Sequence, residues 1–180
     1  MIKMNLQLFA ATAVHGKRLV YFFRILKDAT TKSGRVMAFT TENTRSKSKD
    51  FESTETKDGP VPTPGATEGE VSVTALLSVA EDSEYATLDE MEDAMDASDT
   101  VEIWEVNLDK PASGGTNKFS CRYFHSNITE LEISSSAEEM AEVELTFALV
   151  GNGKTGEATV TKEQQEAAEY QFKDLAAAGA

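Results

Sequence analysis

The triplet Gly153-Lys154-Thr155 is the most suggestive chemical motif in this chain, because it resembles the end of a phosphate-binding loop. The full motif requires another glycine five residues before Gly153, and Ala148 occupies that position. The helix whose N-terminus would hold the phosphate is predicted to begin only at Thr161, too far along the chain. The triplet is therefore interpreted as part of a turn and not as a nucleotide site.

Histidine and cysteine offer little further chemistry. The chain has two histidines, His15 and His125, and one cysteine, Cys121. Cys121 and His125 are predicted to share a strand face, but no second cysteine or close acidic cluster completes a metal site. Neither histidine has the sequence context of a catalytic base, and the acidic residues at 89–99 lack the spacing of a calcium loop. We therefore expect no catalysis, no metal and no cofactor. A single cysteine cannot form an internal disulfide, which fits synthesis in a reducing cytoplasm.

Charge is divided unevenly along the chain. The net charge is −14 at pH 7, but residues 1–57 carry +6 and residues 58–180 carry −20. An acidic protein of this kind does not bind nucleic acid over its whole surface. The division suggests that one region meets the opposite charge of another subunit. No apolar run approaches the roughly 20 residues that span a membrane, so no membrane binding is expected.

The length and the 40% of hydrophobic residues indicate one folded domain, residues 1–180. Its first segment, residues 1–16, makes a poor signal peptide because it lacks a strongly basic start. This segment is interpreted as an N-terminal arm whose apolar residues dock on a neighbour, with a frayed terminus as the alternative. Residues 175–180 are expected to form a loose tail.

Alternating and β-branched segments predict about seven strands. They cover residues 18–26, 35–41, 70–79, 100–107, 118–124, 127–134 and 142–150. The first two are expected to pair as a hairpin. A turn is predicted at 111–116, and the glycines at 151–156 are expected to end the last strand.

Two helices are predicted from capping boxes. Thr87 and Glu90 begin the clearer one, which extends to Ala97 and has an apolar stripe. Thr161 and Gln164 begin a second one that extends to about residue 173. Because strands and helices do not alternate regularly, the predicted fold is mainly β. We expect two packed antiparallel sheets, a β-sandwich or barrel, with one flanking helix, a long inter-strand loop and a C-terminal helix.

Residues 42–69 show neither helical nor strand periodicity and are predicted to form that long loop. A loop much longer than ~15 residues is unusual in a compact domain and is typically functional or disordered. It carries the cations Arg45, Lys47, Lys49 and Lys57. Its second half has prolines at alternate positions, which lower the entropy lost when an extended segment docks. The candidate contact residues are Arg45, Lys47, Lys49, Phe51, Lys57, Pro60, Pro62 and Pro64.

A second candidate surface is the polar face of the alternating strands. Glutamates recur at the positions that alternate with apolar residues, and no lysine accompanies them. Like charges side by side on neighbouring strands destabilise a sheet, so a function is expected to balance that cost. An ordinary solvated face is the alternative. The residues concerned are Glu70, Glu130, Glu132, Glu142 and Glu144.

The stretch TENTRSKSKDFESTETKDGPVPTPG at residues 41–65 resembles the signature loop of siphophage major tail proteins of the lactococcal-phage type. The resemblance continues in EDAM at 92–95, in VEIWEVN at 101–107, in the acidic strands and in TKEQQEAAEYQFKD at 161–174. It covers nearly the whole chain, and the segment around TRSKSKD is the most specific part. The insertion-like PASGG at 111–115 and the alanine-rich end depart from the family pattern.

The resemblance implies a structural virion protein that is not an enzyme. In that family, six copies form a ring, their sheets join into a continuous β-barrel around a channel, and rings stack on a tape-measure protein into the tail tube. The long loop reaches an adjacent ring, and DNA passes down the channel. The expected partners are copies of the chain itself, the tape-measure protein, the tail terminator and distal tail proteins, and DNA in transient passage. Such tails assemble in the host bacterial cytoplasm and become part of the virion.

Combined with this resemblance, the residues assign two roles. The cations of the 42–69 loop are expected to meet acids on the next ring, because an identical loop-to-body contact repeated head to tail produces a filament. The glutamate face is expected to line the channel and repel DNA phosphates within about 8 Å at physiological salt.

Two alternatives to a tube subunit share its predicted fold class. A head–tail joining or tail terminator protein would form a single ring with the same fold. A host-binding β-sandwich is less favoured, because Trp104 lies within a strand and Phe51 is the only aromatic residue in the long loop.

Overall fold

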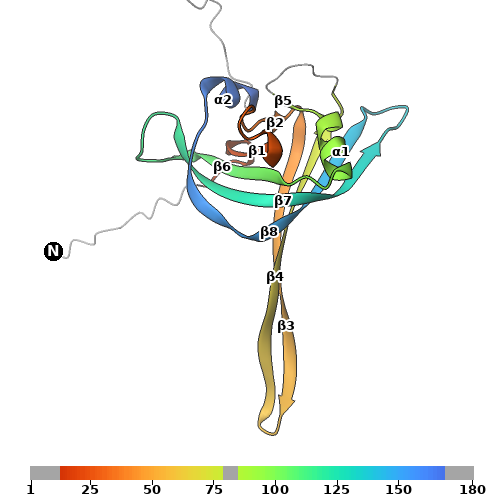
Figure 1. Cartoon of the computed structure of the whole chain (residues 1–180), viewed down its shortest axis with the longest axis vertical. Helices are drawn as coiled ribbons and strands as arrows, with labels where there is room; N and C mark the ends of the chain where they lie inside the picture. Colours follow the sequence, from red (N-terminus) through yellow and green to blue (C-terminus); the bar gives the residue numbers. More distant parts are fainter. Residues whose placement is uncertain (1–12, 79–84, 169–180) are drawn as a thin grey trace, which may run out of the picture.

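Six strands form one antiparallel sheet in the computed structural model, which describes residues 13–78 and 85–168 (Figure 1). The strand order is β1-β6-β7-β8-β4-β3. The bounds are β1 (Leu19–Ile25), β3 (Thr40–Thr56), β4 (Gly59–Leu76), β6 (Val101–Pro111), β7 (Lys118–Ser134) and β8 (Glu142–Thr159). Two short strands, β2 (Val36–Met37) and β5 (Tyr85–Ala86), form a separate parallel pair. The helices are α1 (Leu88–Asp96) and α2 (Lys162–Ala168), and single 3-10 turns lie at η1 (Gly16–Arg18) and η2 (Leu26–Asp28).

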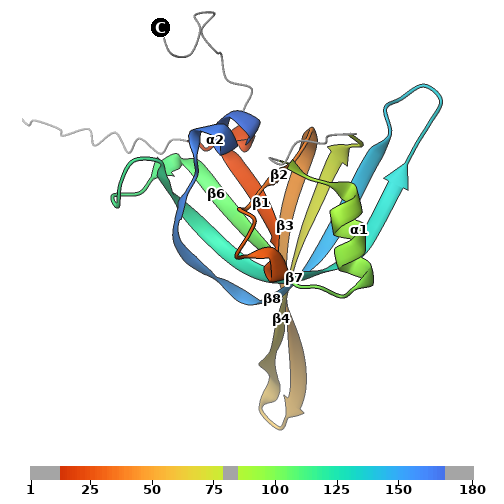
Figure 2. The same ribbon diagram turned by 45° about the horizontal axis from the view of Figure 1, so that its top comes forward.

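The long sheet curls around its own core, so the predicted pair of packed sheets is wrong although the mainly β class is confirmed. Phe23 of β1 stacks on Phe147 of β8, with ring centroids 5.3 Å apart, although two strands separate β1 from β8 in the sheet. The curl does not close into a barrel, because the two outermost strands, β1 and β3, are not paired with each other. Figure 2 shows α1 lying on the concave side of this sheet.

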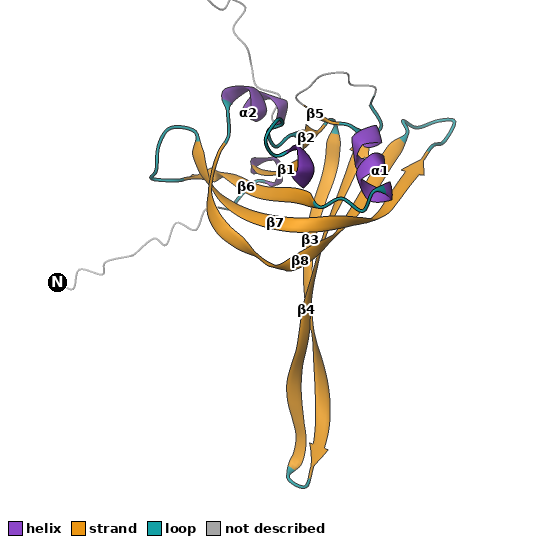
Figure 3. Ribbon diagram, in the orientation of Figure 1, coloured by secondary structure: helices purple, strands orange, loops and turns teal. Residues whose placement is uncertain are grey.

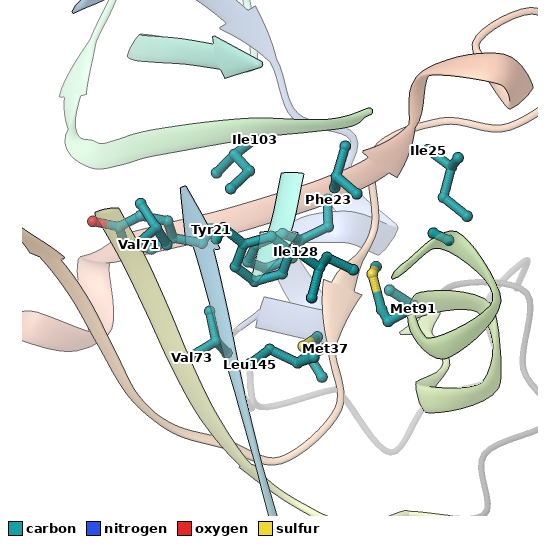
Figure 4. Packing of buried hydrophobic residues seen from close by; sticks show 14 of the residues in the cluster. Tyr21, Phe23, Ile25, Met37, Val71, Val73, Met91, Ile103, Ile128 and Leu145 are labelled. Atoms are coloured by element: carbon teal, nitrogen blue, oxygen red, sulfur yellow. The ribbon is translucent and has the colours of Figure 1, made fainter. Parts of the chain in front are cut away.

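The concave side holds the main hydrophobic core. Residues from β1, β4, β6, β7 and β8 meet there with Met91 and Ala94 of α1 (Figure 4). The predicted capping box of α1 is confirmed, since the Thr87 hydroxyl accepts from Glu90 N–H and the Glu90 carboxylate accepts from Thr87 N–H. A smaller cluster on the other side of β1 and β6 includes Phe22, Val106 and Val160.

Two strand predictions were wrong in their extent. The segments 118–124 and 127–134 are one strand, β7, whose register against its neighbour β8 shifts twice. β8 continues through the glycines at 151–156 instead of ending there, because Gly151 and Gly153 take positive φ angles of 72° and 67°. Such irregularities sharpen the local twist and bend a strand, which allows a single sheet to curl over a core.

The predicted hairpin between 18–26 and 35–41 is also wrong. β1 pairs with β6 along its whole length, and its link to the second segment is one isolated bridge between Phe23 and Arg35. The C-terminal helix is confirmed as far as Ala168, with the Thr161 and Gln164 capping interactions in place. The predicted loose tail and the predicted N-terminal arm up to residue 12 lie outside the described residues. Among the described residues, no helix is both long enough and apolar enough to cross a membrane.

The largest correction concerns residues 42–69, which form a long β-hairpin and not a structureless loop. β3 and β4 pair from Thr40 with Ala75 to Thr56 with Gly59, and only the part of β4 from Glu70 onward also pairs with β8. The remainder, residues 47–69, projects from the body as a two-stranded arm (Figure 1). Strand prediction relies on one buried face, and this arm buries neither, so its alternation carries no apolar signal.

Candidate functional site

The convex face of the sheet carries the acidic surface. In β4 and β8 the buried residues Val71, Val73, Val143 and Leu145 point to the concave core, so the residues that alternate with them point the other way. The register aligns Thr74 with Glu144, and Glu132 with Glu144. All five predicted glutamates, Glu70, Glu130, Glu132, Glu142 and Glu144, are therefore exposed on one face.

A sixth glutamate belongs to the same face and was not singled out from the sequence. Glu42 of β3 is exposed and pairs with Thr74 of β4, one of the convex-face residues. It went unnoticed because the residues around it lack apolar alternation. Among the described residues at the convex positions of β3 and β4, from Glu42 to Ser48 and from Glu68 to Leu76, there is no lysine or arginine. The acidic surface therefore extends without interruption to the edge strand.

At the base of the arm, the two faces of the hairpin carry opposite charges. Lys47 and Lys49 pair with Gly69 and Thr67 on the face that continues from the concave side. Glu68 pairs with Ser48 on the opposite face, next to the acidic surface. Both lysines are exposed, and within the described residues neither forms an ion pair. The two faces of the arm therefore offer opposite charges to a neighbour.

The outer half of the arm is proline-rich and exposes an aromatic residue. Phe51 is 66% exposed and pairs with Pro64. The register continues with Ser53 opposite Pro62 and Glu55 opposite Pro60, so all three prolines lie on one face with Phe51. Lys57 lies in the turn at the tip, where the Thr56 hydroxyl donates to the Gly59 carbonyl at 2.6 Å. All the predicted contact residues except Arg45 thus lie along the projecting hairpin.

Arg45 differs from the other predicted contact residues because it is engaged inside its own chain. Its guanidinium pairs with the Glu105 carboxylate of β6 and lies 5.9 Å from the Phe124 ring. The Tyr21 hydroxyl of β1 donates to the same carboxylate at 2.7 Å. Burial, together with Glu105, raises the pKa of Tyr21 well above its usual range. This cluster connects β3 to β1 and β6 across the concave side and holds the root of the arm against the body.

The residues that suggested catalysis or metal binding have structural partners. The Tyr123 hydroxyl donates to the buried Glu102, which also accepts from Arg24 at 2.6 Å, and His125 Nε2 lies 2.6 Å from the same hydroxyl. Burial and Glu102 raise the pKa of Tyr123 to about 12. Cys121 is buried, and burial raises the pKa of its thiol to about 11. Among the described residues, no group of histidine, cysteine and acidic side chains could hold a metal ion.

The Gly153 triplet is part of β8, with Lys154 paired to Tyr123 and Thr155 paired to Arg122. A side chain at Gly153 would lie 2.4 Å from the Phe124 ring, so the glycine serves close packing between β7 and β8. A cleft of about 700 Å³ between β1, β6 and α2 is lined by Phe22, Arg35, Trp104 and Gln164, among others. The Arg35 guanidinium in it already binds the Tyr85 carbonyl and Glu90. The arm and the acidic face carry the predicted contact residues and the predicted channel residues.

A family model described as phage tail tube protein matches residues 13–154 of this chain. Among solved structures, the chain is similar to the SPP1 tail tube, with a TM-score of 0.69 and 17% identity over 89% of this chain and 91% of that one. It is also similar to a chain in the tail of an empty GTA particle refined with C6 symmetry, with a TM-score of 0.60 and 15% identity over 80% of this chain and 99% of that one. A search of curated proteins finds no significant match.

Proposed function

Because the chain belongs to the phage tail tube protein family, we propose that it builds the tube as hexameric rings stacked head to tail through the arm. It is a structural protein of the virion tail that forms the tail tube, and not an enzyme. The family assignment alone gives neither the number of copies in a ring nor the contact by which rings stack. The C6 symmetry of the similar GTA tail supports a ring of six.

The single observation that carries the proposal is the arm, residues 47–69. An isolated two-stranded hairpin is marginally stable in water, because it buries too little surface. This one exposes Phe51 and Val61 and projects from the body as its longest extension (Figure 3). A contact between the arm of one copy and the body of the next repeats head to tail, and such a contact extends into a filament.

Two exposed cations at the base of the arm support the same arrangement. Lys47 and Lys49 lie on one face of the arm, while the convex face of the body is acidic. Arg45 contributes to the contact indirectly. Its ion pair with Glu105 fixes the direction in which the arm leaves the body. The prolines Pro60, Pro62 and Pro64 hold the outer half of β4 extended before docking.

The convex acidic face is proposed to line the channel. Six copies whose edge strands β1 and β3 approach those of their neighbours would remove the open edges of each sheet. Glu42, Glu70, Glu130, Glu132, Glu142 and Glu144 would then surround the DNA path. Their repulsion of phosphates reaches about 8 Å at physiological salt, so it prevents adhesion near the wall and does not drive DNA along.

Finer points rest on the residue patterns of the sequence and on its resemblance to the lactococcal-phage type of siphophage tail protein. They are a single tail-tube domain over residues 1–180, an N-terminal arm at 1–16 that docks on a neighbour, a loose tail at 175–180, and assembly in the host cytoplasm. The proposed partners besides further copies are a tape-measure protein, tail terminator and distal tail proteins, and DNA in passage. Membrane binding by this chain is not part of the proposal.

Deletion of residues 46–64 tests the proposal. We expect a folded protein with an intact body and no tubes in electron micrographs, whereas the full chain forms long tubes under the same conditions. Circular dichroism of the deletion variant checks that the body has folded. Normal tube growth without the arm would refute the stacking role, and single rings from the full chain would favour a tail terminator instead.

A further inference from the structure

Asn152 and Gly153 form the one Asn-Gly step in the sequence of the chain. Asparagine is among the thermolabile residues, because the backbone nitrogen of the following residue can attack its side-chain amide carbon. Glycine has no Cβ, so no side chain hinders that approach. Asn152 is also exposed, which gives the reaction access to the water that it consumes. The two residues therefore have the identity and the solvent contact that this reaction requires.

The Asn-Gly step lies in an irregular part of β8. Between two regular pairs of β7 and β8, the single residue Phe124 lies opposite three residues, 151–153. The chain turns on both sides of Asn152, since Gly151 and Gly153 have φ angles of 72° and 67°. The extra residues of a bulge leave the ladder of strand hydrogen bonds. The Gly153 nitrogen therefore has no partner in the strand register that would restrain its approach to the Asn152 side chain.

Cations surround the same position. Asn152 lines a small hollow together with Arg45, Lys47 and Arg122, among others. Arg45 already pairs with Glu105, whereas within the described residues Lys47 and Arg122 form no ion pair. Positive charge stabilises the negative charge that develops on the attacking nitrogen and on the amide oxygen. The hollow thus favours the attack and holds two cations that lack a counter-charge.

We infer that Asn152 is a site of spontaneous deamidation. The Gly153 nitrogen loses its proton to solvent and forms a bond to Cγ of Asn152, while the side-chain nitrogen takes up a proton and leaves as ammonia. The product is a succinimide ring. Water opens this ring at either carbonyl and gives aspartate or isoaspartate. The net reaction consumes water and releases ammonia, with no change of oxidation state.

Deamidation places a carboxylate at position 152, in the hollow that holds Lys47 and Arg122. Nearby opposite charges favour the ionised form of a carboxyl group. Lys47 belongs to β3, Arg122 to β7 and position 152 to β8, so the new carboxylate connects three strands where the arm leaves the body. Isoaspartate lengthens the backbone, and the bulge accommodates this because it already lies outside the ladder. The subunit gains this connection with age, independently of the proposed stacking.

Mass spectrometry of peptides from the aged, folded protein tests the reaction. Incubation in mildly alkaline buffer should convert the amide of Asn152 to the acid and release ammonia. Mildly acidic buffer should slow the conversion, because fewer backbone nitrogens lose their proton. Asn127 is the internal control, because isoleucine follows it and its amide should persist. Retention of the Asn152 amide in the folded protein, or equal conversion of Asn127, would overturn the inference.

Variants test the part assigned to the cations. Combining Arg122→Gln with Lys47→Gln should slow the conversion about fivefold, because each removed charge lies close to the attacked amide. Circular dichroism checks that this double variant has folded. A rate equal to that of the unsubstituted protein would show that the hollow does not promote the reaction.

A further variant supplies the product in freshly made protein. Asn152→Asp should raise the melting temperature by about 1–3 °C through its pairing with the two cations. The rise should be absent when Arg122→Gln and Lys47→Gln are also present. Asn152→Ser is the matched control, because it keeps the position polar and uncharged. Equal melting temperatures for Asn152→Asp and Asn152→Ser would refute the connection between the three strands.

Discussion

Glu132 of β7 and Glu144 of β8 lie directly opposite each other on the convex face of the sheet. Like charges at opposed positions destabilise an antiparallel pair, because their side chains are separated by about 5 Å. A lysine at either position would instead stabilise the same strands. The subunit therefore carries a stability cost on the face proposed to line the channel.

Glu132→Gln should raise the stability of the isolated subunit by about 0.2–1 kcal/mol, because it removes the repulsion from Glu144. Thermal unfolding followed by circular dichroism measures the change. Added salt should stabilise the unsubstituted protein more than the variant, since salt screens the repulsion. Glu138→Gln is the matched control, because Glu138 is exposed in the connection between β7 and β8 and has no strand partner. A lower melting temperature for Glu132→Gln would contradict the like-charge explanation.

Neutralising the channel surface should change DNA passage and not assembly. With Glu130, Glu132, Glu142 and Glu144 all replaced by glutamine, we expect tubes of normal appearance and slower DNA ejection, because phosphates would adhere to the uncharged wall. Electron microscopy checks the tubes, and a fluorescence assay of DNA release from virions checks the rate. Unchanged release would reject the placement of this face in the channel.

Sequence patterns located the acidic face because each contributing strand buries its other face. Val71 and Val73 of β4 are fully buried, so the polar residues between them had to be exposed. Likewise, the spacing of Thr87 and Glu90 predicted where α1 begins, because capping depends on residues close in sequence. Features decided by neighbours within a few residues were therefore predictable.

The arm and the curl of the sheet were not predictable by the same reasoning. The arm has no buried face, so its strands resemble a polar loop in sequence. The curl depends on register shifts between β7 and β8, next to His125 and Glu130, which arise from pairing between distant segments. The glycines at 151 and 153 predicted the end of β8, but their positive φ angles lie within the strand and bend it. The ion pair between Arg45 and Glu105 also depends on this curl, and no pattern in the neighbouring sequence predicts it.

Gly153→Ala should destabilise the subunit by about 2–4 kcal/mol. The new methyl group would overlap the Phe124 ring, and the φ of +67° is unfavourable for alanine. Chemical denaturation measures the loss. Gly156→Ala is the control in the same strand, because open space surrounds its position and its φ is not positive. Equal stabilities for the two variants would show that Gly153 has no packing role.

Acid should weaken the connection between α1 and the segment before β2. Burial raises the pKa of Glu90, but hydrogen bonds from Lys32 and Arg35 outweigh it, so the net pKa lies below its usual range. A carboxylate with a depressed folded pKa stabilises the protein above its unfolded pKa of about 4.3, and that stability is lost as the pH falls through the folded pKa. Melting temperatures at pH 7 and pH 3 measure this loss. Glu90→Gln should show a smaller fall between the two; an identical fall would exclude Glu90 as a contributor.

Three prolines on one strand have a consequence for subunits that await incorporation. Pro60, Pro62 and Pro64 alternate along β4, so their nitrogens share one side of the strand, and pairing with β3 continues across all three. This side of β4 faces away from β3. At these positions an incoming strand would find no amide hydrogens for its carbonyl oxygens. Spare copies can accumulate without zipping together into fibrils along that edge. Strand pairing along the outer half of β4 is thus blocked in subunits that are not yet part of a tube.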